Sequence, residues 1–263
     1  MSRRNSRARS RALAQNFLVD DEIVDSLIRT LDPGPDSLVL DLGAGRGALT
    51  EPLTRTAGRV VAVERDPRLV DHLRRKSPGW GGVEVRSADI LRVPLPAERH
   101  MVISNAPYNI GTALIRRILT EAHGLTRGVF VLQAETARRL SGTPRSGLFA
   151  ATWSPWFTFE LGATIAPECF RPKPSVRSAV LTIEPRSRPL LSPAAHGEYR
   201  AFVERMFQAG DTSLRGRMKG VAGARAANRI ASELGLRGAA TPSEAAPEDY
   251  ARIFAAIASR EEG

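Results

Sequence analysis

Three glycines, Gly43, Gly45 and Gly47, lie between an apolar segment and a helical one. The apolar segment, residues 37–42, predicts a short buried strand, and residues 48–56 predict a helix. Glycines at such a junction let the backbone approach a ligand, and the amino-terminal end of the helix then faces that ligand. A strand, a glycine loop and a helix in this order favour parallel strands joined by crossover helices.

The same alternation continues along the chain. Further strands are predicted at residues 59–64, 83–86, 101–104 and 128–132, and further helices at 20–31, 67–75 and 112–121. Two late apolar segments, 158–165 and 176–183, have prolines but no helix between them, which predicts an antiparallel pair at the sheet edge. The expected fold class is therefore α/β, with a doubly wound, Rossmann-like parallel sheet.

The carboxyl-terminal part has a different pattern. Residues 185–193 contain several prolines and serines and predict a linker. Residues 241–244, Thr-Pro-Ser-Glu, predict a capping box that opens a last helix. Between them, apolar residues recur at helical spacing: Tyr199, Phe202, Val203, Met206 and Phe207. We therefore expect a small all-helical domain at 186–263, after an α/β domain at 15–185 and a basic flexible arm at 1–14.

The charge balance favours a polyanionic partner. The 263 residues include 38 Lys and Arg against 28 Asp and Glu, a net charge of +10, so nucleic acid is the first candidate. Arginine-rich codon usage is the alternative explanation, because nearly all of these cations are arginines. Cys169 is the single cysteine, which excludes an internal disulfide and a multi-cysteine zinc site. No apolar run approaches the roughly 18 residues of a membrane span, so we expect a cytoplasmic protein.

Residues 1–15 are rich in Arg and Ser and lack acidic residues. Such a segment is typical of a transit peptide or of an RNA-binding arm. We favour the arm, because the segment runs directly into residues 15–18, Gln-Asn-Phe-Leu, and leaves no spacer for cleavage. The expected RNA-binding residues are Arg3, Arg4, Arg7, Arg9 and Arg11, with Arg138, Arg139, Arg215, Arg217 and Lys219 as weaker candidates that could equally be solvated.

The spacing of the glycines favours S-adenosylmethionine as the ligand. The loop has the pattern G-x-G-x-G, whereas a dinucleotide pyrophosphate requires G-x-G-x-x-G. Glu64 ends the next strand, where a carboxylate can accept hydrogen bonds from both ribose hydroxyls; a solvated acid is the alternative. Asp89 can accept from the adenine amino group while Ile90 packs on its ring, or Asp89 caps a helix. Asp41 either orders the loop or faces the methionine ammonium group.

Residues 105–108, Asn-Ala-Pro-Tyr, can orient an adenine for methylation. An exocyclic adenine amine is a poor nucleophile because its lone pair is delocalised into the ring. The Asn105 side-chain oxygen and the Ala106 carbonyl can accept its two hydrogens and direct the lone pair at a methyl group. Pro107 fixes the turn, and the Tyr108 ring can stack on the base, unless it only fills the core. A sulfonium leaving group needs neither a metal ion nor a strong general base.

These motifs occur in the order seen in ribosomal RNA adenine N6-methyltransferases, which the chain resembles over about residues 10–185. The matching segments are 15–18, the 41–47 loop, Glu64, Asp89, 105–108 and 170–176. The resemblance implies that Asn16 and Leu18 close over the cofactor, that Gly43 contacts its methionine part, and that Phe170 helps to hold a flipped adenine. Ala106 departs from the Ile or Leu usual in that motif, but the backbone carbonyl acts there, so we expect activity.

The resemblance assigns residues 15–185 to cofactor binding and catalysis and 186–263 to RNA binding. The cofactor-binding residues expected in total are Asn16, Leu18, Asp41, Gly43, Gly45, Glu64, Arg65, Asp89, Ile90 and Asn105. The catalytic set is Asn105, Ala106, Pro107, Tyr108 and Phe170, with no metal ligand.

Two branches of this family match in part. The Erm type methylates an adenine of 23S rRNA and gives resistance to macrolides, lincosamides and streptogramins, whereas the KsgA-like type dimethylates adjacent adenines of 16S rRNA. The basic arm, the short helical domain and residues 199–203 resemble the Erm type, which we favour; residues 105–112 resemble the KsgA-like type more. We expect a monomer, and the sequence leaves the target nucleotide and the number of methyl groups open.

Three other classes fit less well. A non-catalytic nucleic-acid-binding factor on the same fold has no need for Glu64, Asp89, Asn105 and Tyr108 together. A DNA adenine methyltransferase usually carries a sizeable target-recognition insertion, for which the short segment after residue 185 gives little room. A dehydrogenase is disfavoured by the glycine spacing.

Deleting residues 1–14 is expected to lower RNA affinity and to reduce its salt dependence, because fewer arginines then displace counterions from phosphates. Filter binding at several salt concentrations measures both quantities, and calorimetric titration with cofactor checks that the ligand site is intact. Unchanged RNA binding after truncation would contradict an RNA-binding arm.

Overall fold

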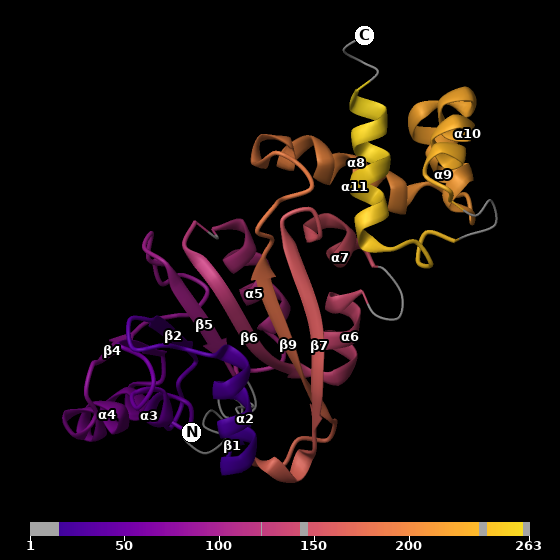
Figure 1. Ribbon diagram of the computed structural model, residues 1–263. Helices are drawn as coiled ribbons and strands as arrows, with labels where there is room; N and C mark the ends of the chain where they lie inside the picture. The colour runs from indigo at the N-terminus through magenta and orange to yellow at the C-terminus, as the bar shows by residue number, and fades with distance from the viewer. Residues whose placement is uncertain (1–15, 122, 143–146, 237–240, 260–263) are drawn as a thin grey trace, which may run out of the picture. The chain divides into compact units, whose positions relative to one another are not determined.

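The computed structural model describes residues 16–121, 123–142, 147–236 and 241–259 (Figure 1). The described residues divide into two compact units. One unit falls within Met1–Ala137 and Gly162–Glu184, and the other within Arg138–Leu161 and Pro185–Gly263.

A mixed sheet carries the first unit. Among the described residues, seven strands follow the order β4-β3-β2-β5-β6-β9-β7. Their bounds are β2 (Leu38–Leu42), β3 (Arg59–Glu64), β4 (Val83–Ser87), β5 (His100–Ser104), β6 (Leu125–Gln133), β7 (Phe157–Ile165) and β9 (Ser178–Pro185). The five strands from β4 to β6 are parallel, and β9 is antiparallel to β6. A second, two-stranded sheet pairs β1 (Phe17–Leu18) with β8 (Phe170–Arg171).

Helices connect these strands and build most of the second unit. The first unit has α2 (Asp21–Leu31), α3 (Thr50–Leu53), α4 (Pro67–Lys76) and α5 (Gly111–Thr120), and α6 (Ala134–Ser141) spans the division. The second unit has α7 (Leu148–Trp153), α8 (His196–Gln208), α9 (Leu214–Ala222), α10 (Ala224–Glu233) and α11 (Pro247–Ala258). Short 3-10 turns lie at Ser77–Gly79, Pro167–Cys169 and Pro193–Ala195.

The strand order fixes where a ligand can bind. All five residues of β2 are buried, and β2 pairs with β3 on one side and with β5 on the other. The chain thus passes from β2 to one neighbour and returns later to the opposite one, which makes a topological switch point beside β2. Because ligands of open α/β sheets bind at the carboxyl ends of the strands at such a point, the segments after β2, β3 and β5 become the candidate site.

Most elements expected from the sequence are present, including the late antiparallel strand beside β6. The helix expected at 48–56 is reduced to α3 and flanking turns. The last helix does not begin at the predicted capping box. The Glu244 carboxylate accepts a hydrogen bond from the Thr241 N–H, which closes a turn, and α11 starts only at Pro247, where Asp249 caps the Ala246 N–H.

The second unit includes residues 138–161, which the sequence analysis places in the catalytic domain. The physical reason is packing of α7 on the later helices. The buried Tyr199 hydroxyl of α8 donates a hydrogen bond of 2.7 Å to the Ala151 carbonyl of α7. The Arg186 guanidinium joins the Ser154 carbonyl to the Glu248 carboxylate. Within the described residues, no helix is long and apolar enough to cross a membrane.

Gly58 directly precedes β3, and a Cβ at this position would lie 2.1 Å from the Pro35 carbonyl oxygen. Gly58→Ala is therefore expected to destabilise the first unit. Forcing the backbone apart should lower the free energy of unfolding by roughly 1–3 kcal/mol. Gly79→Ala is the matched control: a Cβ at Gly79 meets no atom within 4 Å, so the change should stay within about 0.5 kcal/mol. Denaturant unfolding of both variants checks this, and equal stabilities would contradict it.

Candidate active site

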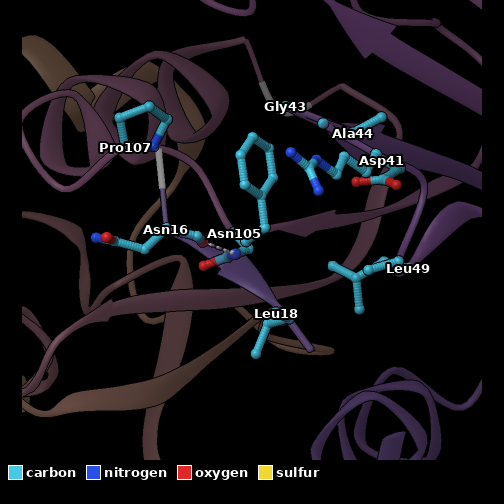
Figure 2. Close-up of a pocket in the computed structure, with 12 residues that line it drawn as sticks. Asn16, Leu18, Asp41, Gly43, Ala44, Leu49, Asn105 and Pro107 are labelled. Carbon is cyan, nitrogen blue, oxygen red and sulfur yellow. Dashed lines mark hydrogen bonds between the residues drawn. The ribbon is translucent and has the colours of Figure 1, made fainter. Parts of the chain in front are cut away.

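An open pocket of about 410 Å³ lies beside β1 and the carboxyl ends of β2 and β5 (Figure 2). Seven of the residues predicted from the sequence line it: Asn16, Leu18, Asp41, Gly43, Gly45, Asn105 and Pro107. Five other lining residues were not assigned from the sequence: Phe17, Ala44, Arg46, Ala48 and Leu49.

The glycine loop closes against β3 and packs against the Phe17 ring. The Gly43 and Ala44 N–H groups both donate to the Val63 carbonyl, at 2.9 and 3.0 Å. Gly45 has a φ of 59°, and a Cβ there would lie 3.0 Å from the Phe17 ring. Glycine therefore permits both the left-handed backbone and the close packing of Phe17 on the loop.

The Glu64 carboxylate holds this loop in place. It is buried, with 2% of its surface exposed, and accepts three backbone N–H bonds: from Gly45 at 3.0 Å, Arg65 at 2.7 Å and Asp66 at 2.9 Å. A carboxylate has about four acceptor sites, so capacity for a further donor remains. Glu64 is therefore not a solvated strand-end acid, and its expected contact with a ribose stays a prediction.

Asp41 is a buried acid with one unsatisfied oxygen. Its Oδ2 accepts a hydrogen bond of 2.6 Å from the Thr50 hydroxyl, while Oδ1 has no partner among the described residues. Burial, reinforced by the nearby Glu64 carboxylate and opposed by the Thr50 bond, raises the pKa of Asp41 to about 7. Buried polar atoms are rarely left unpaired. An unpaired carboxylate oxygen lining a pocket therefore fits a ligand that brings a donor or a cation.

Asn105 is oriented by the amino-terminal segment. Its Nδ2 donates a hydrogen bond of 2.9 Å to the Asn16 carbonyl, marked by the dashed line in Figure 2. This bond uses the donor side of the amide, so Oδ1 remains as an acceptor. The preceding Ser104 hydroxyl donates to the Leu42 carbonyl at 2.6 Å and ties the end of β5 to that of β2. The amide and the glycine loop thus share one rigid edge of the sheet.

Phe17 and Arg46 form a contact that sequence reasoning missed. The Arg46 guanidinium carbon lies 4.9 Å from the centroid of the Phe17 ring, in a cation–π arrangement at the rim of the pocket. Both residues sit inside motifs that were recognised, beside Asn16 and Gly45 respectively. The contact joins segments that are far apart in the chain, so no sequence pattern around either residue indicates it.

Four of the predicted cofactor residues are not in the pocket lining: Glu64, whose contacts are given above, and Arg65, Asp89 and Ile90. The Asp89 carboxylate accepts a bond of 2.9 Å from the Leu91 N–H and lies 3.9 Å from the Arg65 guanidinium. Ile90 is buried. The first of these contacts closes a turn, and no helix for Asp89 to cap follows it among the described residues. The cofactor roles of Arg65, Asp89 and Ile90 stay predictions.

Phe170 has no exposed surface. It pairs with Leu18 across the two-stranded sheet and packs in the hydrophobic core with Ile165 and Val180. The ring has no exposed face in this structure, and the expected contact with a flipped adenine stays a prediction. Its position anchors the segment that carries Asn16 and Leu18.

The candidate RNA-binding residues divide by their contacts. Arg138, Arg139 and Lys219 are exposed. Arg215 donates to the Asn228 side chain. Arg217 donates to the backbone carbonyls of Met206, Phe207 and Asp211, so it closes the end of α8 and is held by the protein itself. The remaining candidates, Arg3, Arg4, Arg7, Arg9 and Arg11, lie outside the described residues.

Comparison with known proteins decides the family. Residues 6–259 match the family described as ribosomal RNA adenine dimethylase. The chain belongs to this family. The enzyme class expected from the sequence, an rRNA adenine N6-methyltransferase, is thereby confirmed.

Individual members of the family are clearly similar to this chain. An rRNA adenine N-6-methyltransferase of Streptomyces fradiae is 39% identical over 198 residues, which cover 74% of this chain and 61% of that protein. The mycinamicin-resistance protein MyrB of Micromonospora griseorubida is 35% identical over 195 residues, 74% of this chain and 62% of its own length. The chain thus spans less than two thirds of both relatives.

A solved structure is similar over nearly the whole chain. The 23S rRNA methyltransferase ErmE is 31% identical with a TM-score of 0.84, and the match covers 92% of this chain and 100% of that one. This likeness confirms the Rossmann-like fold with a helical carboxyl-terminal part.

Asp41→Asn is expected to flatten the pH dependence of stability. With a native pKa of about 7 against 3.8 in the unfolded chain, the native carboxyl keeps a proton that the unfolded one releases. The free energy of unfolding of the wild type therefore falls as the pH rises from about 4 to 7, while an amide is unaffected. Between pH 5 and 8 the variant should gain roughly 2–3 kcal/mol relative to the wild type.

Denaturant unfolding at several pH values measures this gain. Asp36→Asn, at an exposed carboxylate, is the control and should follow the wild type. Parallel pH profiles for Asp41→Asn and the wild type would show that Asp41 is ionised in the folded protein.

Proposed function

We propose that this protein transfers methyl groups from S-adenosylmethionine to the N6 atom of an adenine in 23S rRNA and so confers resistance to macrolides, lincosamides and streptogramins. The observation that carries the proposal is the pocket in which the unpaired Asp41 oxygen and the oriented Asn105 amide lie on one sheet edge. Family membership supplies the reaction class.

The lining residues fit the cofactor. Asp41 Oδ1 would accept from the methionine ammonium group, which supplies the donor that this oxygen lacks. The bare backbone at Gly43 and Gly45 leaves room for the ligand, and Asn16 and Leu18 would cover it. When bound, S-adenosylmethionine supplies a methyl group on a sulfonium, which is an activated leaving group. A cation beside Asp41 also favours its ionised form, so cofactor binding near neutral pH should release a proton.

The turn after β5 would hold the base. Asn105 Oδ1 and the Ala106 carbonyl would accept the two amine hydrogens, and the nitrogen lone pair would then point toward the pocket. Pro107 brings no competing N–H into this turn. The Tyr108 ring, which is half-buried, would stack on the adenine.

Two observations favour 23S rRNA as the target. ErmE, a 23S rRNA methyltransferase, matches this chain over nearly its whole length, and MyrB is a mycinamicin-resistance protein. The net charge of +10 suits RNA, and Arg138, Arg139 and Lys219 are exposed to contact it. We propose that the enzyme acts as a cytoplasmic monomer. Dimethylation of 16S rRNA is the second candidate, because residues 105–112 resemble that branch.

Asn105→Ala is expected to lower the methylation rate at saturating cofactor by at least about a hundredfold, because the amine loses one of its two acceptors. Single-turnover methylation with labelled cofactor measures the rate. Gln208→Ala, which removes an exposed amide on α8, is the control and should match the wild type. Full activity of Asn105→Ala in a folded protein would remove Asn105 from the mechanism.

The target is tested by offering protein-free 23S rRNA and intact small ribosomal subunits together with labelled cofactor. Label in one 23S adenine and reduced macrolide susceptibility of expressing cells are expected. Label only in 16S rRNA would favour the second candidate. Cofactor binding without transfer to any RNA would favour the non-catalytic, nucleic-acid-binding alternative.

A further inference from the structure

The hydroxyl group of Tyr108 is held by a buried serine. The Tyr108 oxygen lies 2.6 Å from Ser178 Oγ, so the two hydroxyls share a hydrogen bond. Ser178 has no exposed surface, whereas Tyr108 is half-buried. The bond therefore joins a partly exposed ring to a fixed point in the protein interior.

The backbone on both sides makes Ser178 rigid. Ser178 begins β9 and pairs in register with Gln133 at the end of β6. Beside it, the Arg177 carbonyl accepts a hydrogen bond of 3.0 Å from the Ala134 N–H. Because the backbone around Ser178 is held in this way, the Ser178 hydroxyl stays in place and restrains the Tyr108 hydroxyl that is bonded to it.

The amino-terminal segment reaches the same ring. The Asn16 side chain interacts with the Tyr108 hydroxyl, and the Asn16 carbonyl accepts the bond from Asn105. The residue expected to stack on the base and the residue expected to orient its amine are therefore both tied to Asn16. Ser178 is the contact that Tyr108 makes with the sheet itself.

Burial raises the pKa of the Tyr108 phenol above its usual range, while the bonds to Ser178 and Asn16 oppose this rise. The phenol is therefore neutral at physiological pH. With its hydroxyl engaged and neutral, Tyr108 can serve the reaction through its ring face rather than as a proton carrier.

We propose that Ser178 is a positioning residue, which fixes the Tyr108 ring in the orientation that stacks on the target base. This inference rests on the proposed function. The ring turns about two bonds, and the phenol oxygen lies on the axis of the second. An anchor at this oxygen restrains the first rotation, which decides where the ring lies. Without the anchor the ring samples other orientations, and fewer encounters with the base are productive.

Tyr108→Phe separates the role of the hydroxyl from the role of the ring. This variant keeps the ring but loses both the bond to Ser178 and the contact with Asn16, so it should be at least as slow as Ser178→Ala. Ser178→Ala should lower kcat by roughly 3- to 10-fold, the loss of one hydrogen bond, with KM for the cofactor unchanged. The double variant should be no slower than Tyr108→Phe alone, because that change already removes the contact that Ser178→Ala removes.

Methylation of the target RNA by the full-length wild type and the three variants tests this. Thr182→Val is the matched control: it removes another buried hydroxyl from β9 and should leave kcat unchanged. Wild-type rates for Ser178→Ala, or losses that multiply in the double variant, would overturn the proposal while the proposed function stands. An inactive wild type would overturn both.

A second measurement separates positioning from a general structural role. The chain has three tyrosines, so protein labelled with carbon-13 in the tyrosine rings gives few signals, and Tyr108→Phe assigns the one of interest. Ser178→Ala should raise the pKa of Tyr108, because the bond to Ser178 lowers it, and should leave the signals of Tyr199 and Tyr250 in place. An unchanged Tyr108 titration would contradict the anchor, and three displaced signals would indicate global disturbance instead.

Discussion

The geometry of this site depends on the carboxylate of Glu64. Three backbone N–H groups converge on it, one from the glycine loop after β2 and two from the start of the connection after β3. Charge-assisted bonds of this kind are about twice as strong as neutral ones. They hold the loop against β3 and thereby fix Asp41 and Gly43 relative to Phe17. An apolar residue at this position would leave these three donors without their acceptor and the glycine loop without this tie to the end of β3.

Asp41 illustrates a conflict between folding and ligand binding. A buried carboxyl with an orphaned oxygen makes the folded chain less stable than an apolar or amide residue would, above all at and above neutral pH. Sites that retain such groups commonly do so because a ligand completes them. The Thr50 hydroxyl offsets part of the penalty at one oxygen and leaves the other without a partner among the described residues. On the proposed function, the ammonium group of the bound cofactor supplies the donor that Asp41 lacks and so stabilises the folded protein.

The sequence predicted the features that a local pattern of residues determines. Buried runs such as residues 59–64 and the glycine spacing after residue 42 predicted the strands, the loop and the sheet edge at which the pocket lies. It could not predict what depends on segments meeting in space. The Phe17–Arg46 contact, the burial of Phe170, and the grouping of α7 with the late helices have no periodic signature, because packing partners decide them. Glu64 was recognised as important, but its bonds to the loop became visible only in the structure.

The bond between Asn105 and the Asn16 carbonyl has a kinetic consequence on the proposed function. The segment that would cover the cofactor is also the partner of the amide that would orient the base. If the demethylated cofactor leaves when this segment moves away, the hydrogen bond between Asn105 and the Asn16 carbonyl breaks at the same time. The Asn105 amide is then no longer held in the orientation that binds the base. Two methyl groups would then be added in separate encounters with the RNA, and a singly methylated product would accumulate before the doubly methylated one.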